Sequence, residues 1–408
     1  MKLILYSWQA NNEQILSDNL TKMGFEIVWF QKECKHYTRD MELAMEMIPF
    51  IHEQGAEAVV SFNYFPIISM ICNTCQIPYY AWVYDCPHFT LYAKQISMPC
   101  NHIGIFDREM VRQLEEEYGI TTVFHAPLSA DADYFENIIT HVSRKKREKY
   151  QCDVSFVGSL YTDEHNYYDM LLTEATERGT IDMLIRQQYF CYEVDYLRQA
   201  VEAERINFAV LQKSMEEQGL MLGDDYFARP EDILMAAVLE KKVTVEERKR
   251  LLTAIAVSAG EAKRNVSAGR TTNLDFRLYT GSDTKALSDL DAYNYGTVDY
   301  HTQMPLVFAG SKINLNISLR SIHSGVPLRV FDIMACGGFV LTNRQPEIEE
   351  YFKDGVEMAN FGSMEECLDK VRYYLSHEEE RQRIAKAGQR KVKEQFSYEA
   401  GAARLFGV

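Results

Sequence analysis

The chain has 408 residues and a formal net charge of −16, from 43 basic and 59 acidic side chains. A chain of this length is too long to fold around one ordinary hydrophobic core, so we expect two domains. The negative charge argues against nucleic acid or an anionic membrane as the main partner. The first residues lack the apolar core and cleavage site of a signal peptide, and no segment has the length and apolarity of a bilayer span. We therefore expect a cytoplasmic protein.

Nine cysteines are scattered along the chain. An odd number without a regular framework is typical of a reducing compartment. The close pair Cys72 and Cys75 lies towards the end of an apolar run, which favours two small buried residues on a helix over a redox motif. Because no second pair of Cys or His stands at zinc spacing, we expect no bound metal.

The first third alternates apolar strand patterns with amphipathic helix patterns. Such alternation is typical of a parallel, doubly wound sheet. We therefore expect a Rossmann-like domain over residues 1–145. The predicted strands cover residues 3–7, 25–30, 58–62, 79–84, 102–106 and 122–125, and the predicted helices include 11–23, 39–53 and 108–118.

A second α/β domain is predicted after a charged run at residues 143–149, which we interpret as a solvated linker or helix end. Its first strand, 153–159, ends in Gly158 and Ser159, a pattern that fits a nucleotide-binding half and a plain strand-turn equally well. Residues 162–263 have a mostly helical composition, so we predict a helical insertion at about 162–265.

The rest of the chain completes this second Rossmann-like domain, which we expect to span residues 146–385. A last helix, within 386–408, is expected to pack back on the first domain. The predicted strands are 276–280, 296–300, 312–318 and 339–343, and the predicted helices are 364–375 and 378–394.

The segment SGVPLRVFDIMACGG, residues 324–338, is the most informative part of the sequence. It follows the predicted strand 312–318 and predicts a loop, then a short helix that ends at a glycine. Arg329 and Asp332 lie one turn apart on one face of that helix. A helix N-terminus at the carboxyl ends of parallel strands is a ready anion site. A cation and a carboxylate there suit a ligand with phosphate at one end and hydroxyl groups at the other, such as a nucleotide sugar.

The chain resembles the two-Rossmann GT-B glycosyltransferases, and more closely the glycosyltransferase-like family of the CgeB spore-maturation type. The resemblance covers most of the chain except the helical middle. It implies transfer of a sugar from a nucleotide donor without a bound metal, with the donor on the second domain and the acceptor on the first. The residues that carry it are SKINLN at 311–316, PLRVFD at 327–332, ACGG at 335–338, QPEIEEYF at 345–352 and WVYDCPH at 82–88.

In related retaining enzymes a Glu-x7-Glu motif binds the donor, where the second acid holds the ribose hydroxyls and the first contacts the sugar. Asp332 occupies the second position in this chain and Ser324 occupies the first. The resemblance therefore implies a ribose contact by Asp332. The sequence departs from the motif at Ser324, so the choice between retention and inversion stays open.

Glycosyl transfer requires that the charge on the leaving diphosphate be neutralised. We expect Arg329 to do this, helped by backbone N–H groups near Gly325 and Val326. Lys312, at the start of a neighbouring strand, is a second cationic candidate, and a solvated lysine at a strand end is an equal alternative.

The nucleoside is expected to lie at the front of the second domain. Gly158 and Ser159 would let the backbone approach the donor closely. Tyr300 and His301, after the predicted strand 296–300, are candidates to line the nucleoside pocket beside Asp332. Ordinary aromatic packing is the favoured alternative for Tyr300.

The acceptor hydroxyl must also lose a proton. Asp85 and His88 follow the strand 79–84 of the first domain and are our candidates for this step. A turn aspartate that caps the next segment is an equal alternative. His323, just ahead of the donor helix, is a candidate contact for the sugar or the β-phosphate, although a lone histidine more often has a structural role.

The leading hypothesis is a glycosyltransferase that uses a UDP-sugar as co-substrate and acts on a hydroxyl of a protein, glycan or small molecule. Two alternatives stay open. One is a nucleotide-sugar epimerase with the same two-domain fold. The other is a catalytically silent, glycosyltransferase-like binding or assembly protein, and the serine in place of an acid at position 324 supports it. A homodimer through the helical insertion is compatible with the sequence, but no motif indicates it.

Overall fold

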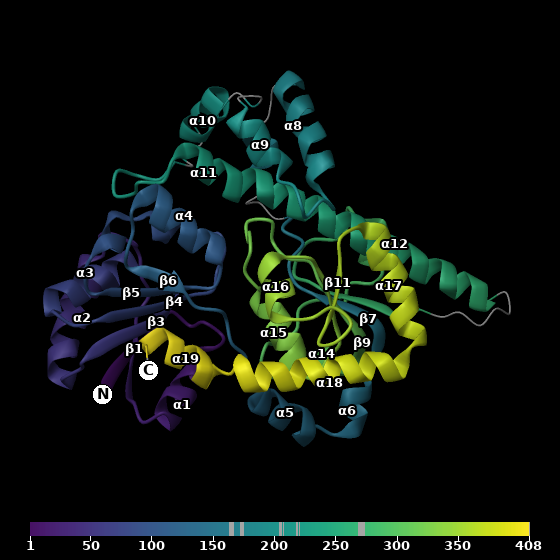
Figure 1. Ribbon diagram of the computed structural model, residues 1–408, viewed down its shortest axis with the longest axis horizontal. Helices are drawn as coiled ribbons and strands as arrows, with labels where there is room; N and C mark the ends of the chain where they lie inside the picture. Colours follow the sequence, from purple (N-terminus) through teal and green to yellow (C-terminus); the bar gives the residue numbers. More distant parts are fainter. Residues whose placement is uncertain are drawn as a thin grey trace.

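The computed structural model describes residues 1–162, 167–171, 175–203, 206, 208–217, 219, 221–267 and 274–407. Within them the chain forms two sheets. One has six strands in the order β2-β1-β3-β4-β5-β6, and the other has five in the order β11-β10-β9-β7-β8. Figure 1 shows the two sheets side by side, each flanked by helices, with a helical segment above them.

The first sheet consists of short apolar strands that all pair in parallel. A parallel sheet is covered on both faces and so requires nearly continuous apolar strands, as in β3, which is buried at every position. The sequence predicts each strand to within one residue at either end. The strands are β1 (Lys2–Ser7), β2 (Glu26–Gln31), β3 (Ala58–Phe62), β4 (Tyr79–Val83), β5 (Asn101–Ile105) and β6 (Val123–His125). The helices between them are α1 (Glu13–Lys22), α2 (Met41–Gln54), α3 (Pro66–Cys75) and α4 (Arg108–Tyr118), with 3-10 turns at Phe89–Tyr92 and Lys94–Ser97.

Helix α4 begins at the carboxyl edge of this sheet. Asp107 caps it by accepting hydrogen bonds from the backbone N–H groups of Glu109 and Met110, at 3.0 and 3.3 Å. An aspartate in this position satisfies N–H groups that have no partner inside the helix. Gly119 ends the helix in the left-handed conformation, at φ +66°. The cap fixes the Asp107 carboxylate at the edge that faces the second domain.

The second sheet follows helices α5 (Ala132–His141) and α6 (Arg144–Glu148), so the charged run at 143–149 is largely a short helix. The strand predicted at 296–300 is wrong, because Gly296 turns the chain at φ +78° and the residues after it lead into α14 (Met304–Gly310). The sequence does not predict β11, since three residues give no readable pattern. The strands are β7 (Cys152–Val157), β8 (Phe276–Tyr279), β9 (Ser311–Asn316), β10 (Val340–Asn343) and β11 (Ala359–Phe361).

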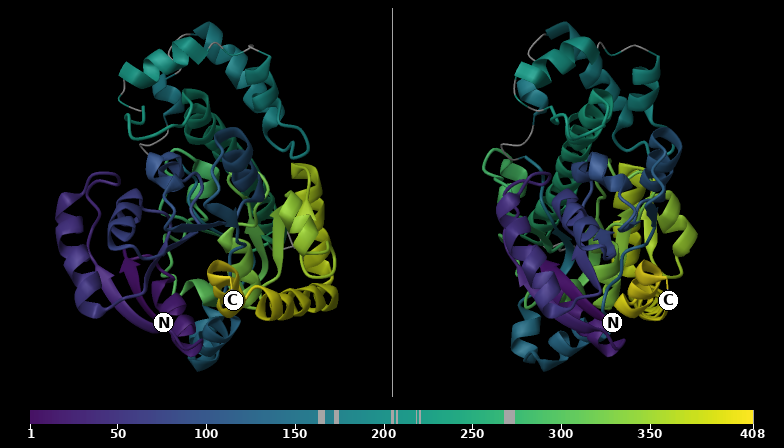
Figure 2. Two further views of the ribbon diagram at one scale, coloured as in Figure 1. Left: turned by 60° about the vertical axis from the view of Figure 1, so that its left-hand side comes forward. Right: turned by 90° about the vertical axis from the view of Figure 1, so that its left-hand side faces the viewer.

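The C-terminal helix joins the two halves of the molecule. It is α19 (Tyr398–Phe406), and it contacts α1, β4 and β5 of the first sheet. Gly401 permits the close approach, because a Cβ there would lie 2.2 Å from the ring of Trp82. Figures 1 and 2 show α18 and α19, in yellow, running along the second half to reach the first. The remaining helices of the second half are α13 (Ser288–Asp291), α14, α15 (Leu328–Ala335), α16 (Pro346–Tyr351), α17 (Met364–Ser376) and α18 (Glu378–Gln395), of which α14, α15 and α17 contact its strands.

The helical middle forms its own apolar cluster, which includes Leu197, Leu234 and Leu239. It also contacts the first domain, where Arg39 pairs with Asp225 at 2.7 Å. The insertion therefore spans both halves (Figure 1). Its helices are α7 (Tyr168–Leu171), α8 (Ala175–Gln188), α9 (Tyr196–Glu202), α10 (Phe208–Glu217), α11 (Pro230–Leu234) and α12 (Glu240–Ser267), with a π-helical turn at Met235–Leu239.

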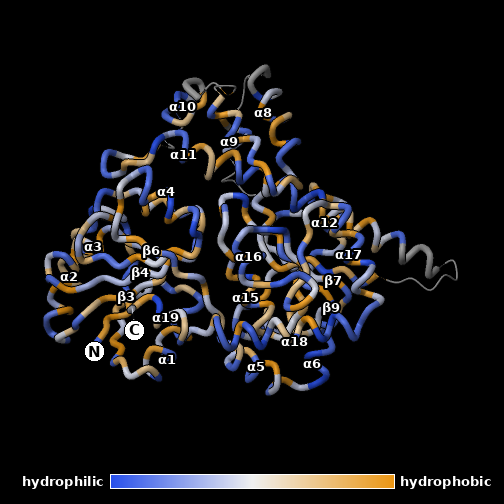
Figure 3. The backbone as a smooth tube through the Cα atoms, in the orientation of Figure 1, coloured by the Kyte–Doolittle hydropathy of each residue, from blue (hydrophilic) through white to orange (hydrophobic). Residues whose placement is uncertain are grey.

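Hydropathy follows this layering. Figure 3 shows hydrophobic stretches along the central strands, whereas α18 is largely hydrophilic. Among the helices within the described ranges, none combines the length and the apolar character that a membrane crossing requires.

Candidate functional site

Arg329 and Asp332 lie on α15, whose N-terminus stands at the carboxyl edge of the second sheet. Arg329 Nη1 is 3.7 Å from Asp332 Oδ2, and Tyr300 donates a hydrogen bond to Asp332 Oδ1 at 2.9 Å. Burial raises the pKa of Asp332 to about 6, although the Arg329 charge and the Tyr300 hydroxyl oppose the rise. The Arg329 guanidinium lies over the ring of Phe308, 5.4 Å from its centroid. The structure thus brings together Arg329, Asp332 and Tyr300 as one cluster.

A hollow of about 330 Å³ opens at the carboxyl ends of β7 and β8. Gly158 and Ser159 line it, and Ser159 Oγ lies 3.1 Å from Ser282 Oγ. The strand order reverses at β7, because β8 pairs on one side of it and β9 on the other. Ligands of open α/β sheets bind in the crevice at such a switch point, which here lies between β7 and β9, beside the hollow.

Sequence reasoning missed Arg248, which lies at this switch point. Its guanidinium donates to the backbone carbonyls of Ser159 and Ile317, the residues that follow β7 and β9 closely. The residue is 7% exposed. A buried guanidinium with five donors can tie two loops together. Nothing in the helical pattern of α12 distinguishes this arginine from its neighbours, so no sequence signal identifies it.

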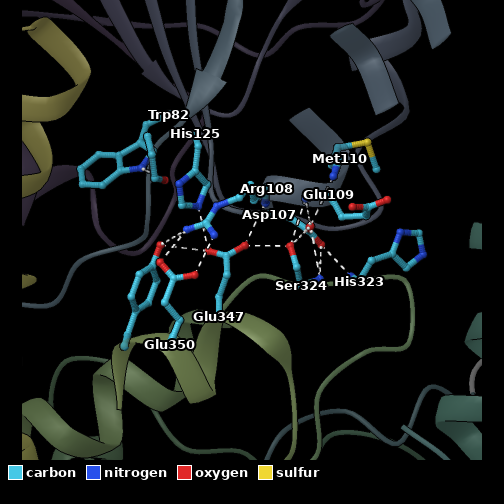
Figure 4. A network of polar contacts seen from close by, with 12 residues as sticks. Trp82, Asp107, Arg108, Glu109, Met110, His125, His323, Ser324, Glu347 and Glu350 are labelled. Atoms are coloured by element: carbon cyan, nitrogen blue, oxygen red, sulfur yellow. Dashed lines mark hydrogen bonds and ion pairs between the residues drawn. The ribbon is translucent and has the colours of Figure 1, made fainter. Parts of the chain in front are cut away.

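A network of polar contacts joins the two domains in front of α15 (Figure 4). Asp107 of the first domain accepts hydrogen bonds from His323 N at 2.6 Å and from Ser324 Oγ at 2.8 Å. Ser324 Oγ also lies 2.7 Å from Glu347 Oε1. Sequence reasoning missed Asp107 and Glu347, which become neighbours only in the folded chain.

Glu347, at the start of α16, is a second centre of this network. Its carboxylate lies 2.7 Å from His125 Nε2 and accepts from the Arg108 N–H at 2.9 Å (Figure 4). Burial opposes ionisation, but the hydrogen bonds from His125, Arg108 and Ser324 outweigh it and lower the pKa of Glu347. Arg108 and Glu350 add a bidentate ion pair, at 2.7 and 3.0 Å. Glu347 therefore holds the domains together as a carboxylate.

This network also determines the surroundings of the loop that precedes α15, residues 324–327. Ser324 bonds to Asp107 and Glu347, so its side chain is engaged in the domain contact. Gly325 closes against the first domain, since a Cβ there would lie 2.7 Å from the Phe106 ring and 2.8 Å from its carbonyl oxygen. Val326 is buried. Gly325 and Val326 thus lie at the contact between the domains, and the predicted role of their N–H groups toward the diphosphate stays a prediction.

His323 lies on the other side of the same loop. Its Nε2 is 3.0 Å from Glu240 Oε1 on α12. Although burial opposes protonation, the Glu240 carboxylate raises the pKa of His323 to about 9. The imidazole is therefore a cation at neutral pH, and its predicted contact with the sugar or the β-phosphate stays a prediction.

Asp85 and His88, the two candidate bases at the end of β4, differ in their surroundings. Asp85 is exposed and accepts a hydrogen bond from Asn63 Nδ2 at 2.6 Å. His88 Nε2 is held within its own loop, 2.7 Å from Thr90 Oγ1 and 3.2 Å from the N–H of Tyr64. Burial lowers the pKa of His88. The structure therefore favours Asp85 over His88 as an available base.

Lys312 lies away from the α15 cluster, whereas His301 is next to Tyr300. Lys312 stands at the amino end of β9 and pairs with Asp153 at 2.8 Å, at the opposite edge of the sheet from α15. The expectation that it enters the donor site is wrong, because parallel strands present their two ends to different faces of the domain. His301 Nδ1 forms a hydrogen bond with the Tyr134 hydroxyl of α5 at 2.7 Å, and its ring lies edge-on to that of Tyr300, 5.2 Å between centroids. Within the described ranges no group of three metal-ligating side chains lies close together.

Comparisons with known proteins agree with this architecture. Residues 248–407, which include the α15 cluster, match a family model described as glycosyl transferase-like. A search of curated proteins found no significant match.

Solved structures resemble the chain over its full length. Sucrose-phosphate synthase from Thermosynechococcus elongatus is 9% identical, with a TM-score of 0.55 and 98% of that chain covered. HepE from Anabaena, solved in complex with UDP-glucose, is 8% identical, with a TM-score of 0.54 and 98% covered. A putative UDP-N-acetylglucosamine 2-epimerase from Listeria monocytogenes is 8% identical, with a TM-score of 0.50 and 95% covered. The predicted fold class is confirmed as two Rossmann-like domains in the GT-B arrangement.

Proposed function

We propose that this chain is a glycosyltransferase of the CgeB type. Its C-terminal region matches a glycosyl transferase-like family model, and its fold is GT-B. It moves a sugar from a UDP-sugar to an acceptor hydroxyl, acts in the cytoplasm and needs no metal. The observation that carries the proposal is the pair Arg329 and Asp332 on α15, at the carboxyl edge of the second sheet and inside the matched segment.

Arg329 neutralises the diphosphate in this proposal. Its side chain is 30% exposed, and its only carboxylate among the described ion pairs is Asp332, at a loose 3.7 Å. The guanidinium can therefore bind two phosphate oxygens without losing a tight partner. As the sugar leaves, negative charge grows on the diphosphate, and a fixed cation stabilises that charge.

Asp332 and the hollow at β7 and β8 hold the nucleoside. The Asp332 carboxylate already accepts from Tyr300 and has capacity for a ribose hydroxyl. Gly158 and Ser159 form the wall of the hollow and allow the donor to approach the backbone. Arg248 keeps this wall in place through the carbonyl of Ser159.

The acceptor side belongs to the first domain. Asp85 is an exposed carboxylate at the carboxyl end of β4. A carboxylate that accepts the hydroxyl proton raises the nucleophilicity of the acceptor oxygen. We assign this role to Asp85, with Asn63 as the residue that orients it.

One alternative has support in the site. The hydroxyl of Ser324, which stands where related enzymes have a sugar-binding acid, is bonded to Asp107 and Glu347. This favours a catalytically silent protein that binds a nucleotide sugar without transferring it. The likeness to an epimerase supports a third reading, in which the donor turns over with no acceptor present.

Titration calorimetry with UDP tests the donor site. Arg329→Ala and Asp332→Ala should each weaken UDP binding by roughly tenfold or more, as expected for the loss of a hydrogen bond to a charged group. Lys312→Ala is the matched control at the opposite edge of the same sheet and should bind as the parent does. If all four proteins bind UDP equally, the donor site is wrongly placed. Turnover of UDP-sugars with and without glycoside acceptors then distinguishes the three functions. A transferase turns over the donor when an acceptor is present, an epimerase does so without one, and a silent protein does neither.

A further inference from the structure

Tyr84 directly follows β4 and directly precedes Asp85, and its hydroxyl has no hydrogen-bond partner among the described residues. The residue is half-buried, yet its hydroxyl is not one of the enclosed polar atoms that lack a partner. The hydroxyl is therefore open to a ligand. A phenol donates one hydrogen bond and accepts another, so it is a suitable contact for a polar ligand.

Asn63 fixes the position of Tyr84 relative to Asp85. Its Oδ1 accepts hydrogen bonds from the backbone N–H groups of Tyr84 and Asp85, at 3.1 and 3.2 Å, and its Nδ2 donates to Asp85 Oδ2. The Tyr84 ring meets the Phe62 ring edge-on, with 5.0 Å between centroids. It also lies 6.4 Å from the Trp8 ring, at an angle of 24°. The Tyr84 ring is thus held beside the proposed base.

The segment that carries Tyr84 also contacts the second domain. Cys86 Sγ donates to the carbonyl of Ser321 at 2.9 Å, in the loop between β9 and α15. The Tyr84 side chain packs against the same hydrophobic cluster as Tyr300 and Leu328 of the second domain. Tyr84 therefore lies where the two domains meet.

Carboxylates from both proposed sites act on the Tyr84 hydroxyl. Burial raises its pKa, and the charges of Asp85, Glu13 and Asp332 raise it further. Because the interaction between charges falls with distance, the hydroxyl lies within electrostatic range of the proposed base and of the proposed ribose ligand. The raised pKa also keeps the phenol protonated at neutral pH, so that it can donate a hydrogen bond.

In the proposed reaction the transferred sugar lies between Asp85, which takes the acceptor proton, and the nucleotide held by Arg329 and Asp332. Ser324, in the position of the sugar-binding acid of related enzymes, already has its hydroxyl bonded in the contact between the domains. We propose that Tyr84 binds the transferred sugar through a hydrogen bond between its hydroxyl and a sugar hydroxyl. The assignment rests on the function proposed above and makes Tyr84 a determinant of donor-sugar binding.

Calorimetry on the full chain tests this contact, with UDP, UDP-glucose, UDP-galactose and UDP-N-acetylglucosamine as probes. At least one UDP-sugar should bind the parent. In Tyr84→Phe its affinity should fall roughly three- to tenfold while that for UDP stays the same, because only a hydrogen bond to the sugar is lost. Tyr80→Phe is the matched control, since that tyrosine lies towards the amino end of β4 with its ring 4.8 Å from that of His102, and it should bind every probe as the parent does. Tyr84→Met, which also lacks the hydroxyl, gives the same comparison if Tyr84→Phe fails to fold.

An unchanged affinity for every UDP-sugar in Tyr84→Phe overturns the proposal. An equal loss of affinity for UDP and for UDP-sugars also overturns it, because the hydroxyl then acts on the nucleotide or on the fold. A change only in the KM for the acceptor during turnover assigns the hydroxyl to the acceptor and has the same consequence. In each of these cases UDP binding by the parent leaves the proposed donor site standing. A parent that binds neither UDP nor any UDP-sugar contradicts the proposed function itself.

Discussion

Ser324 Oγ donates a hydrogen bond to Asp107 Oδ1 over 2.8 Å, although 217 positions separate the two residues in the chain. The contact joins the loop ahead of α15 to the N-cap of α4. It places the donor loop of the second domain directly against the first domain, so that closure of the domains and the shape of the donor site depend on the same few residues.

Removal of the Ser324 hydroxyl should therefore destabilise the protein. In Ser324→Ala the buried carboxylates of Asp107 and Glu347 lose a shared donor, and the free energy of unfolding should fall by roughly 1–3 kcal/mol. Urea denaturation measures the change. Ser376→Ala, where the hydroxyl is exposed on α17, is the control and should stay within about 0.5 kcal/mol of the parent. An equal loss of unfolding free energy in both variants would contradict a stabilising role for the contact between the domains.

Gly325 should not tolerate a side chain. In Gly325→Ala the new Cβ would lie 2.7 Å from the Phe106 ring and 2.9 Å from Asp107 Cα, so the loop must withdraw from the first domain. We expect a larger radius of gyration by small-angle X-ray scattering and a lower melting temperature. Gly179→Ala on α8, where a Cβ meets nothing within 4 Å, is the control. An unchanged radius and melting temperature in Gly325→Ala would count against the close contact.

The stability of the protein should depend on pH through His323. Its pKa is raised to about 9, so the stabilising pair with Glu240 is fully present below the unfolded pKa of about 6.5 and is lost as the pH rises through 9. In His323→Gln the free energy of unfolding should be lower than in the parent by about 2 kcal/mol at pH 6 to 7. The difference should shrink towards pH 9.5, as measured by urea denaturation across that range. A difference that is constant with pH would refute the charged pair.

UDP binding should weaken in acid because of Asp332. Burial raises the pKa of this carboxyl to about 6, so below that pH it is mostly protonated and is a poorer acceptor for a ribose hydroxyl. Between pH 7 and pH 5 the affinity of the parent should fall by roughly tenfold more than that of Asp332→Asn. The comparison cancels the titration of UDP itself, because both proteins bind the same ligand. Parallel profiles from calorimetry would exclude Asp332 as the titrating group.

Much of the fold is predictable from the sequence because its strands are short, apolar and separated by clear helix patterns. Parallel strands buried on both faces give nearly unbroken apolar runs, as at β3, and caps such as Asp107 and Gly119 mark the ends of α4. Prediction fails where the local pattern is weak. The apolar residues after Gly296 resemble a strand, but a turn there leads into α14.

The sequence by itself determined the two Rossmann-like halves, the helical insertion and the pairing of Arg329 with Asp332, because hydrophobic periodicity and helical spacing are local properties. Only the tertiary structure decided that Lys312 lies at the edge of the sheet opposite α15, and that Ser324 and Gly325 contact the first domain at Asp107. It alone placed Arg248 at the switch point. These relationships depend on which elements pack together over long separations in the chain, and residue spacing carries no information about such packing.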